Sequence, residues 1–342
     1  MSKVKRLKLK EGDANAMLKY FNKMSSDNQI FFSMHRLDDD MTLKDILWVD
    51  ARSRVAYEEF GDVVCFDATY LTNEYELPFA NFVGVNHHGQ SILLGCALIS
   101  HENTKTYEWV FSTWLSCMGG KSPMGILTDQ DAAMRKALLT SMPEARHRWC
   151  LWHITEKFCS KLGMFEKYQD IKDDLLYAIY NSLDPSEFEE NWNNVIAKYD
   201  LVDNGWLGGL YREREIWVPA YMRHMFWAGM KTTQRVDSIN SFFDGYVNKH
   251  TRLYEFAERY CEAMEVRAND EKENDANSAR YVRTLETDFS VEAIYQKIYT
   301  DNKFKEVQRE CTRSLYLNVQ GKNVVSDNVL EHYVQDRVWV KM

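Results

Sequence analysis

Three acidic residues lie far apart in the chain, each at a position where a carboxylate could hold a divalent metal ion. Asp67 ends the apolar run 63–66, Asp129 ends the run 125–128, and Asp237 comes much later. Acids gathered from distant segments are typical of Mg²⁺ sites, because the ion takes several hard oxygen ligands in a fixed octahedron. Two such ions can clamp the attacking and leaving oxygens of a phosphodiester. The three aspartates predict such a site; strand-end acids that cap turns are the alternative for the first two.

A second group of potential ligands follows Asp129 in the sequence. Cys150 and His153 form a Cys-x-x-His pair, and His147 and Cys159 lie nearby. Two such pairs would satisfy a tetrahedral zinc site. The surrounding segment 145–154 is predicted to be a strand, which favours a packed or locally hydrogen-bonded pair over zinc.

Cations near the acids raise the question of nucleic-acid binding. The nearest clusters are Arg135-Lys136 and Arg146-His147-Arg148, which would either line a nucleic-acid groove or form a solvated surface. The formal net charge of −9 argues against a strong DNA-binding module, since phosphate binding draws on clustered Lys and Arg, although a local basic face remains compatible with it. The first ten residues carry five cations and no acid. They form either a nuclear-import signal or a solvated basic end.

The elements that must position these residues follow from periodicity. We predict three consecutive strands, the last two joined by a turn at His87-His88-Gly89-Gln90, and then helices alternating with strands. The order β-β-β-α-β-α-β implies a mixed sheet with helices on its faces. It is the order of the ribonuclease H-like fold, in which acids at the ends of the first and fourth strands meet. Asp67 and Asp129, 62 residues apart, stand at those ends. The predicted strands are 63–70, 79–86, 91–100, 124–128 and 145–154, and the helices between them are 106–118 and 131–139.

We expect an α/β protein: a ribonuclease H-like mixed sheet with an α-helical insertion and flanking helices. Before the core, we predict a helix at 13–24, a strand at 45–49 and a helix from Ala51. After it, the pattern is helical and aromatic-rich, with helices expected at 253–266 and over 281–318 and a polar, exposed stretch at 271–277. The expected divisions are a lead-in (1–60), the core (61–158 plus 231–266), the insertion (159–230) and a C-terminal helical segment (267–342).

Composition limits the class of protein. Hydrophobic residues make up 45% and charged residues 27%, which is ordinary for a globular chain. No stretch reaches the roughly 18 apolar residues that a spanning helix needs, so we expect no membrane contact. No signal peptide is recognised at the N-terminus. Seven cysteines without regular spacing favour a reducing compartment.

Long motifs throughout the chain resemble the plant far-red-impaired-response family, over residues 12–305. The motifs that carry the resemblance are Ala51-Arg52-Ser53-Arg54, Phe60-Gly61-Asp62-Val63-Val64, Asp67-Ala68-Thr69-Tyr70, Pro78-Phe79-Ala80, Phe82-Val83-Gly84-Val85-Asn86-His87-His88-Gly89-Gln90, Thr128-Asp129-Gln130-Asp131, His147-Arg148-Trp149-Cys150-Leu151-Trp152-His153-Ile154, Thr232-Thr233-Gln234-Arg235 and Phe242-Phe243-Asp244-Gly245-Tyr246-Val247. These proteins are transcription regulators, several in light signalling, that look like domesticated Mutator-like (MULE) transposases.

The resemblance implies a nuclear protein linked to DNA that forms homo- or heterodimers with regulators of its own family. It also implies three modules: an N-terminal zinc finger, a central transposase-like domain and a C-terminal SWIM zinc finger. Only the middle module is recognised here, so zinc is expected only in modules absent from this chain. Asp67, Asp129 and Asp237 become an ancestral catalytic triad with a vestigial Mg²⁺ site, and Cys150 and His153 a signature pair near the core.

The third acid departs from the family pattern. The family has Glu where this chain has Asp237, and the shorter side chain pulls the carboxylate back by roughly 1 to 1.5 Å. Active-site placement matters within about 0.5 Å. We therefore expect a transcription regulator without catalysis. An active Mg²⁺-dependent transposase using all three aspartates is the competing hypothesis, and an interaction scaffold without DNA contact is a third.

Overall fold

The structure of the chain, a computed structural model, describes residues 12–69, 73–326 and 329–336. The basic segment 1–10 and Tyr70, the last residue of the first core strand predicted above, lie outside the described residues. The chain divides into two compact units. The first comprises Met1–Asn86 and Ser91–Ala263, and the second comprises His87–Gln90 and Met264–Met342.

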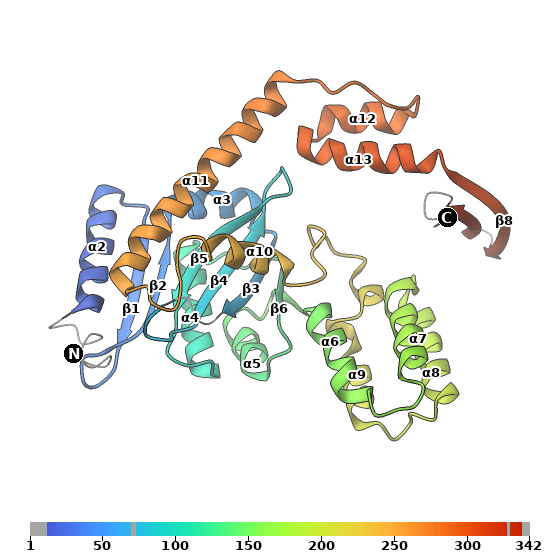
Figure 1. Cartoon of the computed structure of the whole chain (residues 1–342), viewed down its shortest axis with the longest axis horizontal. Coiled ribbons are helices and arrows are strands. Elements are labelled where there is room, and N and C mark those ends of the chain that lie inside the picture. Colours follow the sequence, from blue (N-terminus) through green and yellow to red (C-terminus); the bar gives the residue numbers. More distant parts are fainter. Residues whose placement is uncertain (1–11, 70–72, 327–328, 337–342) are drawn as a thin grey trace. The chain divides into compact units, whose positions relative to one another are not determined.

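A seven-stranded mixed sheet forms the centre of the first unit (Figure 1). In spatial order its strands are β1 (Phe32–Leu37), β2 (Leu43–Val49), β5 (Ser91–Leu98), β4 (Phe79–Val85), β3 (Val63–Thr69), β6 (Gly125–Thr128) and β7 (Arg146–Trp149). β4 pairs antiparallel with both β3 and β5, whereas β6 runs parallel to β3 and β7 runs parallel to β6. The predicted order β-β-β-α-β-α-β is confirmed. β1 was not predicted, because this edge strand is half-exposed and shows no clear alternation.

Helices cover both faces of this sheet. They are α2 (Asp13–Asp27), α3 (Ala51–Phe60), α4 (Thr104–Cys117), α5 (Ala132–Ser141), α10 (Gln234–Phe243) and the first part of α11 (Leu253–Arg280). Successive side chains of a strand point to opposite faces. Leu47 and Val49 accordingly pack in the core under α3, α4 and α5, whereas Trp48 between them contacts Phe21 of α2 and Phe256 of α11. The result is a three-layer arrangement of helices, sheet and helices.

A second apolar core lies in the helices that follow β7. These are α6 (Leu151–Leu162), α7 (Tyr168–Asn181), α8 (Pro185–Lys198) and α9 (Gly205–Arg212), with short 3₁₀ turns at Arg214–Ile216 and Pro219–Met222. Trp192 and Trp217 are buried here against Phe188, and the Trp217 indole N–H donates to the Leu210 carbonyl at 2.9 Å. The aromatic side chains of this region therefore contribute to a core of its own.

The second unit contains the end of α11, followed by α12 (Ser290–Ile298), α13 (Asp301–Ser314) and the antiparallel pair β8 (Leu317–Ser326) and β9 (Val329–Asp336). Two expectations are wrong here. α11 continues to Arg280 and includes 271–277, because that stretch holds Glu, Lys and Ala and neither Gly nor Pro. Within 281–318, residues 281–289 are not helical, and β8 begins at Leu317 after α13 ends at Ser314. In the described part of the chain, no helix combines the length and apolar character needed to cross a membrane.

Candidate metal centre

Strand register brings the first two acids level with each other. Cys65 of β3 pairs with Leu127 of β6 in a parallel ladder, so Asp67 and Asp129, each two residues further on, come to the same edge of the sheet. Asp67 is buried, and its Oδ1 accepts the Ala68 backbone N–H at 2.7 Å. Asp129 follows the end of β6 and is half-buried. The nearby Asp131 caps α5 by accepting the Met134 N–H at 2.7 Å.

Helix α10 carries the third acid toward the same place. Asn81 of β4 is the cross-strand neighbour of Asp67, and its side-chain amide donates to Oδ1 of Asn240 on α10 at 2.8 Å. Asp237 precedes Asn240 by three residues and therefore lies on the same side of the helix. Asp237 reaches the surface, and its side chain is only partly covered. The structure thus places all three predicted acids around the end of β3.

The charges of the three carboxylates act on one another. Burial, followed by the negative charge of Asp129, raises the pKa of Asp67 to about 7; the Ala68 N–H and His153 oppose this rise, and Asp237 adds to it. Burial and the charge of Asp129 also raise the pKa of Asp237, again against the effect of His153. Like charges at one site disfavour ionisation. Carboxylate oxygens are the ligands that Mg²⁺ prefers, but among the described residues the three aspartates do not form a group whose ligand atoms all lie within 4.8 Å of one another.

The Cys-x-x-His pair lies at a helix start, which corrects the predicted strand 145–154. β7 ends at Trp149, Cys150 is the N-cap of α6, and His153 lies in its first turn. The helix forms because Leu151, Ile154, Phe158 and Leu162 recur at helical spacing and are all buried. The strand was our reason against a metal role for this pair, so that reason no longer holds.

His153 and Cys150 face Asp129. His153 Nδ1 lies 2.5 Å from Asp129 Oδ1, and the two side chains form an ion pair. One ligand atom from each of the three residues lies within 4.8 Å of the others. The Thr233 backbone N–H donates to Cys150 Sγ at 3.3 Å, and the Thr233 hydroxyl lies 3.5 Å from the same sulfur. Thr128 Oγ1 contacts His147 Nε2 at 2.9 Å, so His147 does not join this group.

These contacts shift the pKa values of both residues of the pair. Burial alone would raise the pKa of the Cys150 thiol, but hydrogen bonds from His153 and Thr233 outweigh it and lower the pKa. Burial alone would lower the pKa of His153, but Asp129 and Cys150 together raise it to about 10. The imidazole is therefore a cation that partly balances the acids at neutral pH.

Two donor sets share Asp129. The three carboxylates offer oxygen ligands suited to Mg²⁺, whereas Asp129, Cys150 and His153 offer the mixed oxygen, sulfur and nitrogen ligands of zinc sites. In the observed arrangement Asp129 Oδ1 is turned to His153. A metal ion among the three aspartates would have to share Asp129 with this imidazole.

Most of the cations predicted to contact nucleic acid interact with other groups of the protein. Arg148 is buried and donates to a backbone carbonyl at 3.3 Å, which argues against a contact with a nucleic acid. Arg135 pairs with Glu213 at 2.8 Å, and Arg146 donates to a backbone carbonyl at 3.0 Å. Lys136 is exposed on α5.

Sequence reasoning missed three residues that organise the site. Thr233 holds the Cys150 sulfur, and Asn81 with Asn240 fixes α10 over the sheet. Thr233 lies in one of the motifs quoted above, which was the available signal. Asn81 lies within an apolar strand and could have been found as a buried amide in need of a partner.

Comparison with known proteins defines the class first. The MULE transposase domain family matches residues 63–157, a range that holds Asp67, Asp129, Cys150 and His153. The protein therefore contains a MULE transposase domain on a mixed α/β fold.

Curated relatives from Arabidopsis thaliana place the chain more narrowly. It is 39% identical to Protein FAR1-RELATED SEQUENCE 5, over 89% of this chain and 39% of that protein. It is 37% identical to Protein FAR-RED IMPAIRED RESPONSE 1, over 89% and 37%, and 36% identical to Protein FAR1-RELATED SEQUENCE 4, over 90% and 42%. The chain belongs to the far-red-impaired-response family. It spans about two fifths of the length of these relatives.

Proposed function

We propose that this chain is the transposase-derived part of a nuclear transcription regulator that works in connection with DNA and without catalysis. Support comes from the family membership and from the MULE transposase domain at residues 63–157. One of the relatives is named for an impaired response to far-red light. A role in light signalling is part of the proposal for this chain.

We further propose that the core is ribonuclease H-like. The spatial order β5-β4-β3-β6-β7, with three antiparallel strands followed by two strands parallel to β3, is the arrangement of that fold. In this chain β1 and β2 extend the β5 edge. The division into a core of 61–158 plus 231–266 and an insertion of 159–230 belongs to the same proposal.

The contact between Asp129 Oδ1 and His153 Nδ1, at 2.5 Å, is the main support for the proposal that the site is not catalytic. In a two-metal mechanism this carboxylate would be free to hold Mg²⁺ beside Asp67. Here the His153 imidazolium faces the Asp129 carboxylate. The third acid is Asp237, whose side chain is shorter than that of the glutamate found in the family. Mg²⁺, if bound, would be held by Asp67, Asp129 and Asp237 as an inherited site.

The net charge of the chain and its family membership are the basis for proposing its partners. A chain with a net charge of −9 offers little general attraction to DNA, so we propose that DNA is contacted mainly through zinc-containing modules outside this chain. We also propose that the chain dimerises with itself or with related regulators. These interactions would take place in the nucleus.

A tethered reporter tests the regulatory role. The chain is fused to a heterologous DNA-binding domain in plant cells, and transcription from a reporter with the matching site is measured. We expect a change in transcription that persists in the Asp67→Asn variant, because the acid site is not needed. The matched control is Asp62→Asn, which changes an exposed acid close to the same strand. No effect on the reporter at equal protein level would contradict the proposal and favour the scaffold.

An active Mg²⁺-dependent transposase is the second candidate function. The convergence of Asp67, Asp129 and Asp237 at one end of β3 favours it. A transposase gene would lie between terminal inverted repeats and occur in many copies, whereas a domesticated regulator would be single-copy without them. Sequencing the flanks of the gene separates the two.

A further inference from the structure

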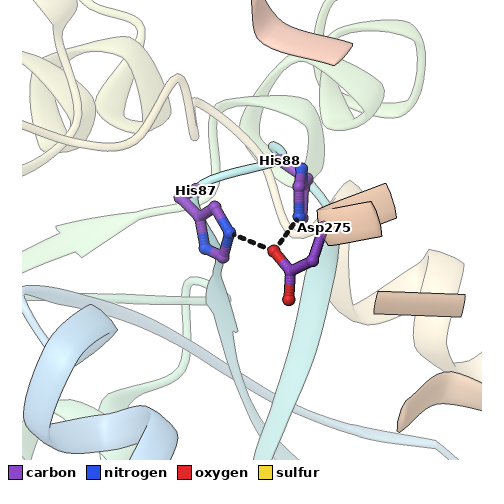
Figure 2. A group of neighbouring side chains, drawn as sticks. All are labelled: His87, His88 and Asp275. Atoms are coloured by element: carbon purple, nitrogen blue, oxygen red, sulfur yellow. Dashed lines mark hydrogen bonds and ion pairs between the residues drawn. The ribbon is translucent and has the colours of Figure 1, made fainter. Parts of the chain in front are cut away.

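A second cluster of potential metal ligands lies in the second unit, apart from the acids. His87 and His88 occupy the turn between β4 and β5, and Asp275 lies on α11. The Nε2 atoms of both imidazoles lie 2.9 Å from the same oxygen, Asp275 Oδ1. Figure 2 shows both rings directed at this carboxylate. The three residues offer ligand atoms within 4.8 Å of one another.

The local sequence fixes the turn that presents the two rings. Gly89 has a φ of 76°, a left-handed conformation that favours glycine. A Cβ at this position would come within 2.9 Å of the Lys303 side chain, so α13 packs closely on the turn. The Thr300 hydroxyl donates to the His87 carbonyl at 2.9 Å and holds the backbone. The imidazoles are therefore presented by a constrained turn.

We propose that His87, His88 and Asp275 form a site for a zinc-class transition-metal ion. Two imidazole nitrogens and one carboxylate oxygen are the donors of three-ligand zinc sites, which leave a fourth position open. Asp275 is 55% exposed in its side chain, whereas His88 is fully buried. The ion would enter from the solvent side, and water would complete its coordination.

The geometry needs only a small adjustment. With zinc–ligand bonds of about 2.0 to 2.2 Å and tetrahedral angles, neighbouring ligand atoms stand about 3.3 Å apart. The two nitrogens are now 2.9 Å from the carboxylate oxygen, so a shift of a few tenths of an ångström makes room. His87 and Asp275 are both partly exposed and can supply it, because their side chains are 40% and 55% accessible.

The charge around the cluster is compatible with a cation. Lys303, the cation packed on the turn, is paired with Glu306 at 2.7 Å. The hydrogen bond from His87 lowers the pKa of Asp275 against the effect of burial, and the hydrogen bond from His88 lowers it further. The metal would replace the two imidazole–carboxylate hydrogen bonds with three coordinate bonds and tie the turn to α11.

This site is independent of the acids around Asp67 and of the proposed function. Its test must separate it from Asp129, Cys150 and His153, which could also bind zinc. The full chain is therefore studied in a Cys150→Ser background after treatment with a chelator. ZnCl₂ is titrated by calorimetry, and Co²⁺ by visible absorption.

We expect this background to bind one equivalent of Zn²⁺, and Co²⁺ to give a spectrum without a sulfur-to-metal band. The His87→Ala/Asp275→Asn variant should lose affinity by at least roughly 10- to 100-fold, the loss seen for outer-shell partners of metal sites alone. Asp270→Asn is the matched control: an exposed acid of α11 whose loss should leave binding unchanged. Circular dichroism checks folding, and His87→Ala alone replaces the double variant should that variant not fold.

Two results would overturn the proposal. One is no saturable Zn²⁺ binding in the Cys150→Ser background. The other is equal affinity in the His87→Ala/Asp275→Asn variant and its parent. In either case the cluster is a carboxylate that accepts hydrogen bonds from two imidazoles and nothing more.

Discussion

At the scale of single residues, Asp129 is the decisive position. It lies level with Asp67 at the edge of the sheet, and its charge raises the pKa of Asp237. It also faces His153 at 2.5 Å. Its carboxylate therefore belongs to two groups: the three aspartates, and the group that it forms with Cys150 and His153. Three acids in a partly buried place repel one another, and one imidazolium offsets only part of that charge.

This repulsion gives a prediction for Asp67→Asn. The carboxyl is 9% exposed, and burial together with Asp129 raises its pKa to about 7. Removing the charge while keeping the shape should stabilise the metal-free fold at neutral pH by up to about 4 kcal/mol, because each unit of pKa difference is worth about 1.4 kcal/mol. The Tm should therefore rise by several degrees. Thermal unfolding in the presence of a chelator measures it. Asp62→Asn, an exposed acid, should change Tm little, and a lower Tm for Asp67→Asn would contradict the account.

At the scale of elements, buried polar residues join segments that periodicity treats separately. Asn81 joins β4 to α10 through Asn240. In the second unit Glu292 of α12 is buried and accepts backbone N–H bonds from Glu286 and Thr287 at 2.9 and 2.8 Å. Gln308 of α13 donates to the same carboxylate at 2.9 Å. One acid thus connects a loop and two helices.

Glu292 predicts how the second unit responds to acid. Burial would raise its pKa, but the bonds from Thr287, Glu286 and Gln308 outweigh it and lower the pKa from 4.5 to about 2. A group whose pKa is lower in the folded state than in the unfolded state stabilises the fold at pH values above its unfolded-state pKa. That stabilisation is complete above about pH 4.5 and is lost as the pH falls toward about 2.

Hydrogen exchange resolved by peptide, and corrected for intrinsic rates, measures this effect. Protection of α12 and α13 should fall between about pH 4.5 and 2 in the native chain. In Glu292→Gln it should already be reduced at neutral pH and should change less across this range. Equal pH dependence in the two proteins would show that another group is responsible.

Periodicity predicted the core elements better than their ends. The order of strands and helices followed from apolar runs, and the parallel register then made Asp67 and Asp129 level. The end of β7 was missed because Cys150-Leu151-Trp152-His153-Ile154 is as apolar as a strand, although its buried residues follow helical spacing. Neither His87-His88 with Asp275, 187 residues after His88, nor the hydrogen bond of Asn81 leaves a local pattern.

At the scale of the whole molecule, a MULE transposase domain lies within a chain that belongs to the far-red-impaired-response family. The chain shares 36–39% identity with three far-red-impaired-response relatives, and its MULE transposase domain includes two of the three acids. We infer that the three acids kept their arrangement after the ancestral catalytic activity was lost. The fold still brings the carboxylates together because β3, β6 and α10 are held by their packing and by Asn81, whether or not a metal is used.

A DNA-cleavage assay on the full chain shows whether the acid site still performs chemistry. Supercoiled plasmid DNA and a duplex carrying terminal repeats are incubated with the chain in Mg²⁺ or Mn²⁺, with Asp67→Asn as the matched inactive control. The account predicts no nicking or strand transfer above the level of Asp67→Asn. Cleavage by the native chain that Asp67→Asn abolishes would contradict it and make this protein an active transposase.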